Sequence, residues 1–299
     1  MAQNRVTLDT VGFRAADGSL PSPVEEKSML PFSFPLDLER DIFEFAARDD
    51  REMALQLVLV SKLVQRWVDP ILYERVWLAS RDQADQFIVA LDSKPAPFFY
   101  NVKVLCLAYP VGRDRAEKIL PLCTALVGFA CWVPNLLTLA TCRDKSPRRI
   151  SFNFSLGEYT PHRVVPDFAA SLFANITHLE FVDDTEFCTE WEGFDLIPHL
   201  THLSFVWAKR FPLSTPPPHA QLALETCPQL RILLLLRPGF SGNAGDGLKL
   251  FNDPRAVILK RQSQSTSNIR SRWEKQWTPG ETDIWNEAEV IAEKQAKMI

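Results

Sequence analysis

Two regions of the chain differ in how their hydrophobic residues are spaced. Between residues 34 and 78, hydrophobic side chains recur every three or four positions and make up 25 of the 45 residues. That spacing indicates helices that bury one face. From about residue 98 the spacing changes to a short pattern, with hydrophobic residues at positions i, i+3 and i+5. The chain is therefore expected to be an α/β protein, with a small helical unit followed by a domain of short parallel strands.

The helical unit is expected to contain three short helices. Its first helix presents a hydrophobic face that consists of Leu38, Ile42 and Phe45. A polar break follows, in which Asp50 can cap the second helix. Ser61 is expected to begin a third helix that ends at Pro70, because proline lacks the N–H that would continue the hydrogen-bond ladder.

The pattern i, i+3, i+5 recurs along the second region. Its clearest copies are Val102, Leu105 and Leu107; Leu136 and Leu139; Ile176, Leu179 and Phe181; Leu200, Leu203 and Phe205; and Leu230, Leu233 and Leu235. Weaker copies lie near residues 149 and 256. Recurrence every 20 to 40 residues or so is typical of stacked strand-plus-helix units, as in irregular leucine-rich repeats. Positions i+3 and i+5 are expected to face the core, and i+2 and i+4 the concave side of such a solenoid.

The remaining segments are expected to flank or connect these units. Residues 1–30 are polar and are predicted to form a disordered tail. Residues 210–219 are predicted to be an extended proline-rich segment, and residues 237–247 a glycine-rich loop.

The C-terminal part, residues 263–299, is expected to be a basic linker followed by a helix. Thr282 would cap that helix, whose hydrophobic face consists of Ile284, Ala288 and Ile291. Because a terminal repeat needs a cover, this helix could cap the last one. The expected domains are thus a helical unit at 31–78, a repeat domain at 79–262 and this C-terminal part.

Composition and charge narrow the classes of function. The 299 residues are 46% hydrophobic and 23% charged, as in ordinary folded proteins. A net charge of -4 gives no general reason to expect nucleic acid as a partner. The N-terminus lacks the basic region and apolar core of a secretory signal. We therefore expect a cytoplasmic or nuclear protein, and six scattered cysteines that are reduced and buried.

Two segments bear on other kinds of partner. Residues 119–142 carry no charge and are long enough to cross a bilayer, but Pro121 and Pro134 interrupt them, so a short helix followed by a strand is favoured. Residues 255–275 carry six Lys or Arg and one Glu, with few aromatic residues. That composition favours a solvated linker over a nucleic-acid site. We expect neither a membrane nor nucleic acid as a partner.

Candidate catalytic and metal-binding residues are weak in this sequence. The glycines between 239 and 247 fit no phosphate-binding motif, and no strong helix start follows them. His199 and His202 are three apart on an expected strand, so they would point to opposite faces, while His178 and His202 share a repeat position that suits a solvent or concave face. Asp183 and Asp184 are expected to be turn residues just after a strand. No catalytic, metal-binding or cofactor-binding residue is therefore expected.

The helical unit resembles an F-box. The elements that carry the resemblance, in their family order, are Phe34-Pro35, Leu38, Ile42-Phe43, a polar break, Leu59-Val60-Ser61-Lys62, Trp67, and Pro70 with Leu72-Tyr73. With the ragged repeats and the C-terminal helix, the chain is similar to the large fungal class of F-box-like proteins with degenerate leucine-rich-type repeats.

This resemblance implies a non-catalytic substrate receptor of a cullin–RING ubiquitin ligase. The F-box would dock on the Skp-type adaptor, and the repeat domain would hold an unknown protein substrate. The adaptor-binding residues that it implies are Phe34, Pro35, Leu38, Ile42, Phe43, Leu59, Val60, Ser61, Lys62 and Trp67. Three alternatives stay open: the unit only closes onto the repeats, the chain is a binding scaffold without a ligase, or a repeat cleft holds an unrecognised enzyme site.

Overall fold

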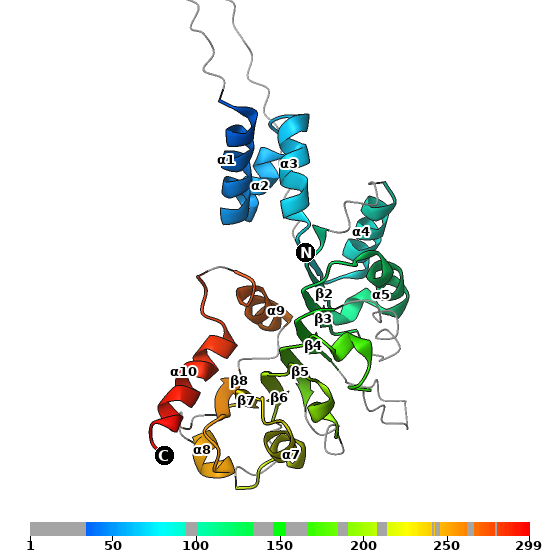
Figure 1. Cartoon of the computed structure of the whole chain (residues 1–299). Coiled ribbons are helices and arrows are strands. Elements are labelled where there is room, and N and C mark those ends of the chain that lie inside the picture. The colour runs from blue at the N-terminus through cyan, green and yellow to red at the C-terminus, as the bar shows by residue number, and fades with distance from the viewer. Residues whose placement is uncertain are drawn as a thin grey trace, which may run out of the picture.

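The protein contains an eight-stranded parallel sheet with helices on both faces, so it belongs to the α/β class (Figure 1). The computed structural model describes residues 34–93, 101–133, 146–153, 167–184, 191–207, 214–240, 242, 246–261, 266–278 and 280–299. The strand order is β1 to β8 in sequence, and each strand pairs in parallel with the next. Each strand is therefore followed by a connection that returns the chain to the same end of the sheet.

The elements have the following bounds. The strands are β1 (Arg75–Leu78), β2 (Val104–Leu107), β3 (Gly128–Cys131), β4 (Arg149–Phe152), β5 (His178–Asp184), β6 (His202–Val206), β7 (Ile232–Pro238) and β8 (Ala256–Arg261). The helices are α1 (Leu36–Asp49), α2 (Arg51–Leu57), α3 (Lys62–Leu72), α4 (Arg81–Ser93), α5 (Arg113–Ile119), α7 (Pro218–Thr226), α8 (Asp246–Phe251), α9 (Thr266–Lys275) and α10 (Ile284–Ala296). Short 3₁₀ turns are η2 (Tyr109–Val111), η3 (Leu120–Leu122), η4 (Ser171–Phe173) and η6 (Phe194–Leu196).

The main core lies between one face of the sheet and the connections, which include α4, α5 and α7 (Figure 1). The expected positions i, i+3 and i+5 fill it in four of the clear copies, because alternate strand residues point to the same face. These buried residues are Val102, Leu105, Leu107, Ile176, Leu179, Phe181, Leu200, Leu203, Phe205, Leu230, Leu233 and Leu235. The copy at Leu136 and Leu139 lies outside the described residues. The spacing thus predicted β2, β5, β6 and β7 correctly, and the weaker copies correspond to β4 and β8.

The same backbone contact recurs where strands β2 to β7 begin. The carbonyl of Thr177 accepts the N–H groups of residues 201 and 202, at 3.0 and 2.9 Å. The carbonyls of Glu74, Lys103, Val127 and Arg148 each accept two N–H groups from the next unit in the same way. Consecutive units therefore share one local geometry although their spacing in sequence is ragged.

Two strands, β1 and β3, were not predicted from the sequence, although both follow the pattern i, i+3 and i+5. In β1 the inward positions are Tyr73, Val76 and Leu78, and in β3 they are Leu126, Phe129 and Cys131. The β1 strand falls inside residues 31–78, the range expected for the helical unit, yet it pairs with β2.

The other face of the sheet is covered by the C-terminal part of the chain (Figure 1). Residues 263–275 were expected to be linker, but 266–275 form α9, whose Ile269 and Trp273 pack on the sheet with Trp277 after it. The second helix, α10, packs on β6, β7 and β8 as expected from its hydrophobic face. Its cap is Asp283 rather than Thr282, because the Asp283 carboxylate accepts the N–H groups of residues 285 and 286 at 2.9 Å.

α10 also meets the open edge of the sheet. The buried Gln295 side chain donates to the carbonyl oxygens of Pro254 and Ala256, at 2.8 and 3.0 Å. The carbonyl of Arg255 points towards β7, where Leu233 N–H donates to it. Successive carbonyls alternate in direction, so that of Ala256 points to the free edge. The C-terminal helix therefore covers the last strand, as part of a larger cover over this face.

Prolines fall inside two helices where breaks were expected. Pro70 lies within α3, which continues to Leu72. Its missing N–H affects only the last turn of the helix, where few backbone hydrogen bonds remain to be made. The proline-rich segment 210–219 ends in α7, with Pro218 at its first position, where the missing N–H costs nothing. Residues 208–213 lie outside the described part of the chain.

Several smaller expectations also have outcomes. Asp183 and Asp184 are the last residues of β5 rather than turn residues after it. The six-residue helix α8 follows the glycine-rich loop, where no helix start was expected. The expected tail at residues 1–30 lies outside the described residues. Cys106, Cys123, Cys131 and Cys227 are buried thiols, as expected. No helix among the described residues has the length and apolar character needed to cross a membrane.

Candidate docking surface on the N-terminal helices

The three N-terminal helices enclose a small core of their own. Ala47, Ala54, Val64, Val68 and Leu72 are buried in it. The rings of Phe43 and Trp67 pack against this core with their centroids 6.2 Å apart. Many of the hydrophobic side chains that α1 to α3 carry take no part in this core.

Local capping explains why these helices begin where they do. The carbonyl of Pro35 accepts the N–H groups of residues 38 and 39 at the start of α1, at 2.9 and 3.1 Å. The Asp50 carboxylate accepts Glu52 N–H at 2.8 Å, and the Ser61 hydroxyl accepts Val64 N–H at 3.2 Å. Both predicted caps are therefore present.

α1 is hydrophobic on two opposite sides. At 3.6 residues per turn, Phe43 and Ala47 lie on one side of the helix, and this side faces the small core. Leu38, Ile42 and Phe45 lie on the opposite side and are exposed. The side that the described residues leave uncovered is thus as apolar as the side that holds the unit together.

The exposed apolar residues of this unit form a group that we call the α1–α3 surface. It consists of Phe34, Leu36, Leu38, Ile42, Phe45, Met53, Leu55, Leu59, Val60 and Leu63. Leu59 and Val60, in the turn between α2 and α3, are 84% and 61% exposed. Single exposed leucines are common on protein surfaces, whereas larger exposed patches indicate an interaction site. Ten such side chains in 30 residues are more than chance exposure explains.

The predicted adaptor-binding residues divide into two groups. Those that the structure leaves exposed are Phe34, Pro35, Leu38, Ile42, Leu59, Val60, Ser61 and Lys62, and the exposed Ser61 also caps α3. Phe43 and Trp67 are half-buried against the small core, so the structure gives these two a role inside the unit.

The exposure of Leu38 and Ile42, at 44% and 51%, also bears on the alternative that this unit simply closes onto the repeats. Side chains that served that purpose would be buried. Sequence reasoning had placed Phe45 and Leu55 on helical faces without assigning them to binding, and it missed Leu36, Met53 and Leu63. A helical-wheel comparison of the two sides of α1 would have identified Phe45.

The unit is joined firmly to the sheet. Only residues 73 and 74 separate α3 from β1. The Arg51 guanidinium donates to the carbonyl of Arg75, in β1, at 3.5 Å, and the Tyr73 side chain packs against both the small core and the main core. The Arg75 side chain reaches across to the carbonyl of Trp277, at 3.0 Å. The α1–α3 surface is therefore held at one position relative to the sheet.

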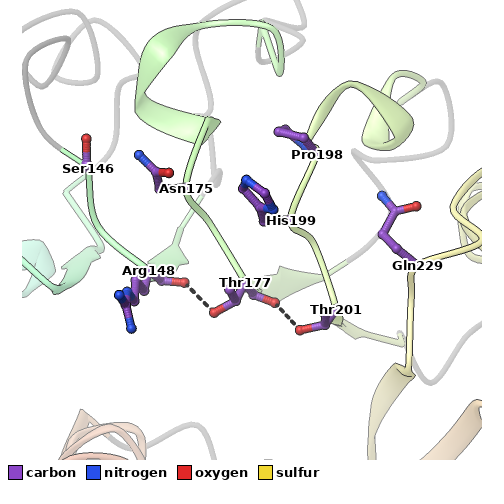
Figure 2. A pocket seen from close by; sticks show the side chains of 8 residues that line it. All are labelled: Ser146, Arg148, Asn175, Thr177, Pro198, His199, Thr201 and Gln229. Atoms are coloured by element: carbon purple, nitrogen blue, oxygen red, sulfur yellow. Dashed lines mark hydrogen bonds between the residues drawn. The ribbon is translucent and has the colours of Figure 1, made fainter.

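A second candidate site is a pocket of about 640 Å³ where β4 to β7 begin (Figure 2). It is lined by Ser146, Arg148, Asn175, Thr177, Pro198, His199, Thr201 and Gln229. The hydroxyls of Thr177 and Thr201 donate to backbone carbonyls of the preceding unit, each at 3.1 Å. These two hydroxyls therefore serve the stacking of the strands.

The histidines at the repeat position i+2 lie on the covered face of the sheet. The rings of His178 and His202 stack 4.1 Å apart, and the Trp285 ring meets both edge-on. Burial, and then the neighbouring His202, lower the pKa of His178 to about 2. Burial also lowers the pKa of His202, although Glu289, 3.2 Å from its Nε2, acts in the opposite direction.

Both histidines therefore lie on the sheet face that α10 covers, and the expected solvent contact is wrong for His202. Among the described residues, no group of three or more His, Cys, Asp or Glu side chains is placed to hold a metal ion.

Comparisons with known proteins identify no relative of this chain. No family model, no curated protein and no solved structure matches the chain. What this protein does must therefore be argued from its own residues.

Proposed function

We propose that this protein is the substrate-receptor subunit of a cullin–RING ubiquitin ligase, present in the cytoplasm, the nucleus or both. In this proposal residues 34–72 are an F-box-like domain whose α1–α3 surface docks on the Skp-type adaptor. The eight-stranded part is an irregular leucine-rich-repeat solenoid that recruits a target protein. The chain itself catalyses no reaction.

The observation that carries the proposal is the second hydrophobic side of α1. A free-standing three-helix unit gains nothing from exposing Leu38, Ile42 and Phe45, because burial of a Leu or Ile side chain is worth roughly 1.5–3 kcal/mol. A stable protein interface needs a cluster of such anchors at its centre. The exposed Leu59 and Val60 extend the cluster to the α2–α3 turn. The order of the F-box elements in the sequence supports the choice of partner.

The sheet supports the second half of the proposal. The strands follow one another in sequence order, and β2 to β7 enter through the same bifurcated backbone contact, which favours a repeat architecture. Stacked repeats commonly offer an extended surface for a partner protein. The mechanism would be proximity: a target held by the sheet has a raised effective concentration near the ubiquitin-conjugating enzyme that the adaptor brings.

The main alternative is a repeat-based scaffold that no longer binds a ligase. It keeps the partner-binding role of the sheet and gives the α1–α3 surface a different partner. An adaptor-binding assay separates the two.

The test is a pull-down of the purified full-length protein with the Skp-type adaptor. The perturbed protein carries Leu38→Asp together with Ile42→Asp, and the matched control carries Leu196→Asp, an equally exposed leucine in η6. Exposed substitutions usually change the free energy of unfolding by only about 0.5 kcal/mol, so both variants should fold. Two buried carboxylates should cost several kcal/mol of binding free energy, about tenfold in affinity for every 1.4 kcal/mol.

We expect the wild-type and Leu196→Asp proteins to retain the adaptor and the double variant to lose it. If a folded double variant binds as well as the wild type, the α1–α3 surface is not the docking site. If the wild-type protein does not bind, the scaffold function replaces the ligase function.

A further inference from the structure

The sheet face beneath α9 has the character of a binding groove. It presents Val104, Cys106, Ala130, Trp132 and Val182, with Trp77 at its border. The rings of Trp77 and Trp132 meet edge-on, 5.2 Å apart. Glu180 brings a carboxylate into this apolar surface and is 2% exposed. A buried carboxylate is costly unless a cation pairs with it.

α9 supplies that cation. The Arg272 guanidinium lies 2.5 Å from the Glu180 carboxylate, and both side chains are largely shielded from water. On the same side of the helix, Trp273 is buried against the groove and Ile269 packs beside it. The groove is thus complementary to a helix that carries an arginine and a large aromatic side chain.

The attachment of α9 is of a kind that can be reversed. Among the described residues, α9 forms no backbone–backbone hydrogen bond with a strand. Side chains supply the connections, with Arg75 donating to the carbonyl of Trp277 and Arg149 to that of Gln276. α9 has 10 residues, and a helix of this length is not stable alone in water. Its departure would leave the ladder of the sheet intact.

α10 differs from α9 in this respect. It covers a continuous apolar area formed by Val206, Ile232, Leu234, Leu236 and Val257. Gln295 also bonds to the backbone at the edge of the sheet. Because Gln295 ties α10 to the strand that ends the sheet, the exchangeable part is α9 alone.

We propose that the groove beneath α9 is the site for a helix of the partner protein, and that α9 occupies it until the partner displaces it. The partner helix would place a basic side chain on Glu180 and a large aromatic ring against Trp132 and Val182. The inference rests on the proposed function only in taking this partner to be the recruited target.

The test measures exchange of α9 with a labelled peptide of residues 263–280, which has the chemistry of the proposed partner. The full-length wild-type protein should bind it weakly, because a tethered segment competes at an effective concentration in roughly the millimolar range. Arg272→Glu in the full-length protein breaks the pair with Glu180 and should release α9. The groove keeps its own residues, so the wild-type peptide should bind this variant about tenfold or more tightly than it binds the wild type.

Lys275→Glu is the matched control. It makes the same change of charge on the same helix, but Lys275 is half-exposed and pairs at 3.5 Å with an exposed Glu281, so binding should stay as in the wild type. Trp273→Ala loosens α9 through an apolar contact and should raise peptide affinity independently of charge. A peptide that itself carries Arg272→Glu should bind none of these proteins.

Peptide affinity that is unchanged in folded Arg272→Glu and Trp273→Ala proteins would overturn the proposal, as would an equal gain in Lys275→Glu. The assay does not involve the N-terminal helices. An adaptor pull-down can therefore fail while peptide exchange succeeds, or the reverse, and the two proposals stand or fall separately.

Discussion

His219 makes the stability of this protein depend on pH in a calculable way. Its ring lies at the start of α7, 2% exposed, with its centroid 4.6 Å from that of the buried Phe205. Neither ring nitrogen has a hydrogen-bond partner among the described residues. Burial alone lowers the pKa of His219 to about 4, from an ordinary value near 6.5.

The direction of this pH dependence follows from which state, folded or unfolded, binds the proton more tightly. The unfolded chain protonates His219 as the pH falls through about 6.5, while the folded protein keeps it neutral until about 4. The stability that the neutral ring provides is complete above pH 6.5 and is lost as the pH falls towards 4. Between pH 7 and pH 5, proton linkage at this one residue lowers the free energy of unfolding by about 2 kcal/mol.

The measurement is urea unfolding of the wild-type and His219→Leu proteins at pH 7, 6 and 5. The variant keeps an apolar side chain in the site but cannot take up a proton there. Its stability at pH 7 is not the test, since leucine changes the packing as well. The difference between the two proteins should change by about 2 kcal/mol over this range in favour of the variant. A difference that stays constant within about 0.5 kcal/mol would refute the buried, neutral histidine.

Two further substitutions test the cover over the sheet. Gly128→Ala places a methyl group where the Trp277 ring lies, so we expect faster amide exchange in residues 266–278 with β3 still protected; unchanged exchange there would contradict the packing of Trp277 on β3. Asp283→Ala removes the cap of α10 and the ion pair with Arg149 at 3.3 Å, and should lower the free energy of unfolding by about 1–2 kcal/mol. Asp283→Asn keeps the cap, so its melting temperature should lie between those of the wild type and Asp283→Ala. Equal losses of stability in the two variants would assign the effect to the charge alone.

The parts of the fold that sequence reasoning recovered are those with a local signature. Leu203 and Phe205 point into the core because strand residues alternate, and this alternation is visible in six letters of sequence. β3 follows the same rule but was hidden, since its strand positions hold Gly, Phe, Ala and Cys inside a long uncharged stretch. α9 was assigned by composition, although Ile269, Trp273 and Trp277 have helical spacing.

Contacts between distant segments left no such signature. The pair of Glu180 and Arg272 joins residues 92 positions apart, and nothing near either residue indicates the other. For the same reason the sequence showed that the N-terminal helices are rich in hydrophobic residues without showing which of them remain exposed. Phe43 and Leu38 are both hydrophobic residues of α1, and only the packing of α2 and α3 decides which side is buried.

The two-residue link between α3 and β1 has a consequence for any complex that this protein bridges. With Tyr73 and Glu74 as the whole connection, and Arg51 donating across it to the carbonyl of Arg75, the N-terminal helices have little freedom to swing relative to the strands. If the proposed function holds, the distance from ligase to cargo is a fixed dimension of the molecule. Lysines on the cargo would then be modified according to where they fall in space, and the residues around them in sequence would matter little.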